Sequence, residues 1–135
     1  MNLSNYLEEA LIDHLFRTNT FAKPAAIYVA LFTAAPTDAG GGTEVVGGSY
    51  ARVAVSQLDV EWDAPVAGNG NTKNSNLISF PAPTGAWGTV VAVGIFDAVT
   101  GGNLLIHGTL ATAKTINGGD PAPQFPAGTL SITLA

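Results

Sequence analysis

Three carboxylates in the middle of the chain have a spacing that could support chemistry. Asp59, Glu61 and Asp63 alternate along a β-type stretch, so they would project from one face of a strand. Carboxylate pairs serve glycoside hydrolysis, and a group of carboxylate oxygens suits a calcium ion. Charged side chains also keep an edge strand from pairing with another chain. We favour this last interpretation, with a cation site as the alternative.

The remaining polar residues give weaker patterns. His107 lies in an apolar strand-like segment and Asp97 lies across a predicted hairpin turn, but one His and one Asp make an incomplete metal site. The sequence has no Gly-x-Ser-x-Gly motif. Residues 68–74 lack the Lys-Ser/Thr ending of a phosphate-binding loop, so we interpret them as a solvated turn. His14 is expected at the edge of the apolar stripe of the N-terminal helix, as a packing residue and not as a ligand. We therefore predict no enzymatic activity, no metal and no cofactor.

Aromatic residues offer two possibilities for recognition. Trp62 and Trp87 are the candidates for an exposed pair that binds carbohydrate. Tyr50 and Arg52 share one face of a predicted strand, and both residue types are enriched at interface hot spots. We predict a partner contact at Tyr50 and Arg52; the alternative, equally open, is that Tyr50 fills the core and Arg52 lies at its rim.

The composition limits the possible classes of protein. A chain of 135 residues favours one domain. Charged residues make up 11%, against roughly 25% in ordinary soluble domains, so much of the surface is uncharged and suited to being covered. A net charge of -5 with five scattered Lys and Arg residues argues against nucleic acid. The chain has no cysteine, no signal-peptide pattern and no apolar run long enough to cross a membrane.

The N-terminal segment predicts one amphipathic helix over residues 3–18. Leucines recur every four residues at Leu3, Leu7, Leu11 and Leu15, Ala10 and Ile12 widen this stripe, and Ser4 or Asn2 can cap the start. Leu3, Leu7 and Leu11 form an apolar stripe that we assign to the partner surface.

From residue 25 onward the patterns are of the β type. Residues 27–32 form an apolar run that predicts a strand buried on both faces. Further strands are expected over residues 50–60, 77–80, 89–97, 104–110, 113–116 and 129–134, with a tight turn at 100–103. The alternation changes phase after Val55, which predicts a bulge or a break near Ser56-Gln57. The fold class is therefore mainly β: a two-sheet β-sandwich or jelly roll with one N-terminal α-helix. We expect a single domain, 1–135, in which the sandwich occupies residues 25–135.

A glycine-rich loop follows the central strand within residues 27–52. It contains Pro36 and five glycines, three of them consecutive at Gly40, Gly41 and Gly42. Such a loop can lie flat against another surface. We assign Gly40, Gly41 and Gly42 to the partner surface with the helix stripe.

Several motifs together resemble one family of small virion proteins of tailed bacteriophages, usually described as tail-fibre proteins. The resemblance is carried by residues 4–8, 28–45, 47–52, 87–89, 94–98, 101–105 and 125–130. Residues 59–63 and Pro121-Ala122-Pro123 depart from the family pattern, so a partner surface there is in doubt. The family brings no catalytic residues.

The resemblance implies a structural protein of the virion. Size and β content also fit cement proteins, which decorate the outside of phage capsids. We predict a capsid cement protein on the capsid exterior, made in the host cytoplasm. Its partners would be the major capsid protein and itself, as a dimer or trimer, without nucleic acid or membrane. The alternative is a structural protein associated with the tail fibre or tail tip.

Overall fold

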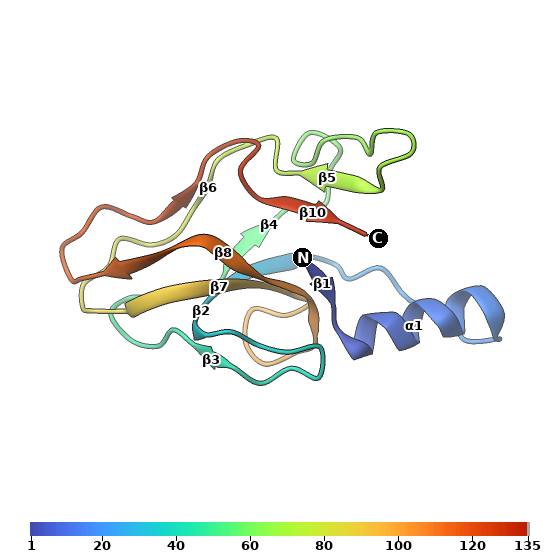
Figure 1. The fold of residues 1–135 in the computed structure, drawn as a ribbon, viewed down its shortest axis with the longest axis horizontal. Helices are drawn as coiled ribbons and strands as arrows, with labels where there is room; N and C mark the ends of the chain where they lie inside the picture. The colour runs from blue at the N-terminus through green and yellow to red at the C-terminus, as the bar shows by residue number, and fades with distance from the viewer. Residues whose placement is uncertain (135) are drawn as a thin grey trace.

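The structure is a computed structural model that describes residues 1–134; Ala135, the last residue of the predicted domain, lies outside the described part. The fold is mainly β with one helix, as the sequence predicts (Figure 1). The main antiparallel sheet has six strands, in the order β1-β8-β7-β2-β3, with β4 also pairing with β2. The bounds of these strands are β1 Asn2–Leu3, β2 Ile27–Ala34, β3 Thr43–Glu44, β4 Val53–Val55, β7 Gly88–Phe96 and β8 Leu104–Ile116.

Two short ribbons form a second layer. β5 (Asn71–Lys73) pairs with β10 (Ser131–Thr133), and β6 (Ile78–Ser79) pairs with β9 (Gln124–Phe125). Phe80 and Leu130, beside these ribbons, pack in one apolar cluster with Val29, Leu31 and Val93 of the main sheet. The layers are arranged as in a sandwich, but two separate ribbons do not identify a jelly roll.

β2 is the central strand of the main sheet, and it is buried on both faces. Val29 and Leu31 face the second layer, while Ala30 and Phe32 pack on the opposite face with Ala92. The prediction from the apolar run is confirmed. β7 pairs with β2 over residues 28–32, so the centre of the sheet is two long strands with apolar side chains on both sides.

Helix α1 (Asn5–Phe16) is shorter than predicted, because Leu3 belongs to β1 and pairs with Ile106 of β8. Backbone hydrogen bonds to the sheet override the helical spacing of the leucines. Ser4 caps the helix by accepting a bond from the Leu7 N–H (3.2 Å), and it also donates to the Leu104 carbonyl. Ser4 therefore fixes the start of α1 to the main sheet.

Two predicted strand boundaries are wrong. Of residues 50–60 only Val53–Val55 form a strand: it ends at the predicted break near Ser56-Gln57, but the chain then turns instead of continuing as a strand, with the Glu61 N–H donating to the Leu58 carbonyl (2.9 Å). Residues 104–110 and 113–116 belong to the single strand β8, which accommodates a register shift against β7. A short alternating segment does not reveal whether a neighbouring strand is available to pair with it.

The glycine-rich segment folds back onto its own sheet instead of lying extended. Gly40 and Thr37 exchange backbone hydrogen bonds in a turn (2.8 and 3.0 Å), after which β3 pairs with β2. Gly42 has φ +77, and a Cβ there would lie 2.7 Å from the Ala34 carbonyl oxygen. Gly41 has φ +76 but faces open space. Both glycines need a left-handed backbone, and only Gly42 also needs the absence of a side chain.

This difference predicts unequal costs for two alanine substitutions. Gly41→Ala should lower the free energy of unfolding by about 1 kcal/mol, the cost of a left-handed alanine. Gly42→Ala should lower it by roughly 1–3 kcal/mol more, because the new methyl group collides with backbone atoms. Urea unfolding of the two variants measures the difference directly. Equal losses would show that the turn relaxes to admit a side chain.

Candidate functional site

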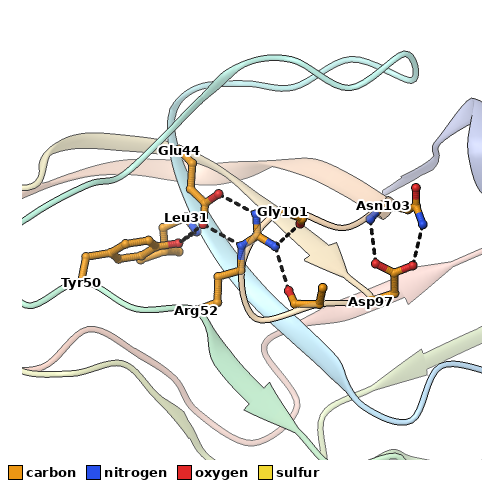
Figure 2. Close-up of polar contacts among 8 residues, drawn as sticks. Leu31, Glu44, Tyr50, Arg52, Asp97, Gly101 and Asn103 are labelled. Carbon is orange, nitrogen blue, oxygen red and sulfur yellow. Dashed lines mark hydrogen bonds and ion pairs between the residues drawn. The ribbon is translucent and has the colours of Figure 1, made fainter.

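The residues predicted as a partner contact, Tyr50 and Arg52, meet Glu44 in a polar cluster beside β2 (Figure 2). Arg52 donates from Nε to Glu44 Oε1 (2.9 Å) and from Nη2 to Oε2 (2.8 Å), a two-point pairing. Its Nη1 donates to the carbonyls of Ala98 and Gly101, both at 2.8 Å. The Arg52 side chain is only 7% exposed. The cluster thus binds β3 and the segment before β4 to the β7–β8 hairpin.

Arg52 also lies against an aromatic face. Its guanidinium carbon is 3.6 Å from the centre of the Phe96 ring, a cation–π contact. In the adjacent hairpin, Asp97 accepts from both the backbone N–H and the side-chain amide of Asn103 (2.7 and 2.8 Å). These bonds stabilise the turn whose carbonyls accept hydrogen bonds from Arg52.

Tyr50 completes the hydrogen bonding of β2. Its hydroxyl accepts from the Leu31 N–H (2.9 Å) and donates to Glu44 Oε1 (2.9 Å). The ring packs edge-on against Trp87, with centroids 5.3 Å apart. Burial, together with the nearby Glu44 carboxylate, raises the pKa of Tyr50 well above its ordinary value. Tyr50 therefore fills the core, which is one of the two interpretations left open by the sequence.

The three alternating carboxylates are not brought together. Residues 59–63 lie in and after a turn, and each carboxylate has its own surroundings: Asp63 accepts from Ser75, Glu61 accepts from Asn76 (3.1 Å), and Asp59 lines a groove. The expected common strand face is therefore wrong, because these residues are not in a strand. Within residues 1–134, no group of three His, Asp or Glu side chains is placed to hold a metal ion.

The other candidate residues have internal partners. His107 is buried and its Nε2 lies 2.9 Å from Oδ1 of Asp38, not near Asp97. Trp87 is buried and donates to the Gly48 carbonyl (2.9 Å), so it cannot form an exposed aromatic pair with Trp62. The exposed His14 accepts from the Phe21 N–H (3.2 Å) and ties the end of α1 to the segment that follows.

An apolar groove of about 860 Å³ lies between α1, the main sheet and the β5–β10 ribbon. Its floor is the second apolar cluster, which contains Leu7, Ile95, Leu105 and Ile132. Leu58, Trp62 and Leu134 form part of its walls, and Leu58 and Leu134 are more than half exposed. A large apolar surface open to solvent marks a site of contact with another molecule.

The predicted partner residues lie in three different places. Leu7 lines the groove, and Leu3 and Leu11 pack against its floor. Gly40 and Gly41 border a separate hollow of about 430 Å³ beside Ser4 and Tyr6, and Gly42 is enclosed by the β2–β3 turn. Tyr50 and Arg52 are in the polar cluster. Their roles as partner contacts stay predictions.

Most groove residues were not singled out from the sequence. Leu58 and Leu134 belong to the predicted strands 50–60 and 129–134, but the structure places both in the lining of the groove. One sequence signal could have indicated the groove. Leu58, Val60 and Trp62 alternate with the charged Asp59 and Glu61, a pattern that suits neither a core nor an ordinary solvated turn.

These features define the class of the protein: a small β-rich body whose prominent surface features are an apolar groove and a helix beside it. No helix of the described residues is both long and apolar enough to cross a membrane.

A comparison with protein-family models matches residues 2–133 to the family described as podophage GP4 fiber I protein gp80. The match spans nearly the whole chain, so the chain belongs to this family of phage fibre proteins. A search of curated proteins finds no match. Membership confirms the resemblance to small tail-fibre-type virion proteins. It favours the tail-fibre alternative and gives no specific support to a capsid cement protein.

The polar cluster predicts a large effect of removing one charge. Arg52→Met should lower the free energy of unfolding by about 2–4 kcal/mol, since it removes the cation that pairs with Glu44 and the donor to two carbonyls. The matched control is Lys73→Met, which breaks the exposed pair with Asp63 (3.7 Å) and should cost less than about 1 kcal/mol. Chemical denaturation of both variants checks this; similar losses would contradict the role of the cluster.

The raised pKa of Tyr50 predicts a loss of stability in alkali. The folded state holds the phenol neutral, so this contribution is fully present below the unfolded tyrosine pKa of about 10 and is lost as the pH rises above it. Tyr50→Phe should be less stable than the wild type at pH 8, because the Leu31 N–H loses its acceptor. Between pH 9 and pH 11, however, the free energy of unfolding of Tyr50→Phe should fall less than that of the wild type. Parallel slopes of unfolding free energy against pH would contradict this assignment.

Proposed function

We propose that this protein is a structural subunit of the phage tail fibre apparatus, acting through contacts with other virion proteins and not through catalysis. The observation that carries the proposal is the family match over residues 2–133. The groove beside α1 supports it, because a fibre component must present an apolar surface that its neighbours cover.

The mechanism is mass action. A protein that binds the assembled partner and not its separated parts stabilises the assembly by the free energy of that binding. Several modest contacts that are geometrically linked then act together. The low content of charged residues, 11%, suits surfaces that lose their water on assembly.

A capsid cement protein on the capsid exterior is the second candidate. The same low charge and small β body fit this role, whose partner would be the major capsid protein. The two candidates differ in where the protein lies on the particle and in how many copies each particle holds.

Labelling of intact virions distinguishes the two locations. Gold-labelled antibody against this protein should mark the tail in electron micrographs. Quantitative mass spectrometry of purified particles should give a copy number far below that of the major capsid protein. Label spread over the shell, with a copy number comparable to the capsid protein, would overturn the fibre proposal in favour of cement.

A further inference from the structure

The second apolar cluster is a core that lacks a cover on one side. Leu7, Ile95, Leu105 and Ile132 are buried, yet they form the floor of the groove of about 860 Å³. The groove is bounded by α1 on one side and by the turn around Leu58 on the other. Its volume and apolar lining suit several side chains from the face of a helix better than a single side chain.

The exposed face of α1 offers such a surface. Ile12 and Phe16 lie one turn apart on the helix, and Leu15 follows Leu11 one turn later on the apolar stripe; at this end of the helix they are 55% (Ile12), 81% (Phe16) and 69% (Leu15) exposed. The helix has 12 residues, so it is about 18 Å long, and Figure 1 shows it extending away from the sheets. The groove therefore lies beside the start of α1, at Leu7, and the exposed apolar residues Ile12, Leu15 and Phe16 form an apolar tip at its end.

The charges favour an antiparallel arrangement of two such helices. Glu8 and Glu9 lie near the start of α1, whereas Arg17 caps its end and Lys23 follows at the rim of the groove. Within residues 1–134, Glu8 and Glu9 have no ion pair or side-chain hydrogen bond, although most other carboxylates do. An antiparallel pair places the acidic end of each helix beside the basic end of the other and opposes the helix dipoles.

We propose that two copies of the chain pair antiparallel through α1, so that the apolar tip of each helix, Ile12, Leu15 and Phe16, covers the groove of the other copy. A twofold contact needs one self-complementary surface. The apolar end of α1 and the groove beside α1 together form such a surface. A small apolar ligand would fill the groove but leave the three side chains of the tip in water. The pairing rests on the structural role proposed above and names one partner of it. Its test in solution does not depend on where the protein lies on the virion.

Sedimentation equilibrium of the full chain tests the pairing. The wild-type protein should have the mass of two chains. Phe16→Glu should weaken the association by at least about tenfold, because it places a charge in the apolar contact. The matched control is Val46→Glu, a substitution at a residue of equal exposure (80%) in the loop after β3, which should associate like the wild type. Circular dichroism establishes that both variants keep the wild-type fold.

Cross-linking tests the geometry separately. The chain has no cysteine, so introduced thiols are the only sites of reaction. A short bismaleimide should join a Phe16→Cys chain to a differently tagged Leu58→Cys chain much faster than to a Val46→Cys chain. A wild-type protein that stays monomeric, a trimer, unchanged association of Phe16→Glu, or equal cross-linking to Leu58→Cys and Val46→Cys would each overturn the proposal.

Discussion

The structure depends on the requirement that every backbone group of the buried strand β2 has a hydrogen-bond partner. β7 satisfies one edge over residues 28–32, but the other edge is divided between β4 at its start and β3 at its end. Leu31 lies at the division. Its carbonyl accepts from Val45, and its N–H donates to the Tyr50 hydroxyl, so a side chain replaces the missing strand residue.

The polar cluster follows from this replacement. A hydroxyl that accepts from Leu31 can donate its proton to Glu44, and a partly buried Glu44 requires a cation. Arg52 is that cation, and its remaining donors reach the carbonyls of the β7–β8 hairpin. Residues with the composition of an interface hot spot therefore close the protein's own sheet, and the open apolar surface is the separate groove beside α1.

Sequence reasoning succeeded where local pattern and tertiary context agree. The apolar run of β2, the turn at residues 100–103 and the cap at Ser4 were predictable, because burial, turn chemistry and capping are properties of short segments. It failed for residues 59–63, where alternation implied a continuous strand, but the chain turns between Leu58 and Glu61 and Trp62 forms only an isolated bridge with Asn74. It also missed Asn74. The predicted solvated turn contains this buried side chain, which donates to the carbonyls of Asn76 and Pro126 and accepts from the Leu130 N–H (2.8 Å). Only the assembled fold brings those segments together.

The size of the second layer links the fold to assembly. The ribbons cover one face of the six-stranded sheet, and their strands have only two or three residues. β6 and β9 help to cover the face around Leu31 and Val93, but β5, β10 and α1 leave the floor beside Ile95 and Leu105 open as a groove. Apolar area that remains in contact with water contributes nothing to folding, and it contributes about 25 cal/mol per Å² once it is covered. A neighbour that covers the groove therefore adds to the stability of the subunit itself, which makes folding and assembly favour each other.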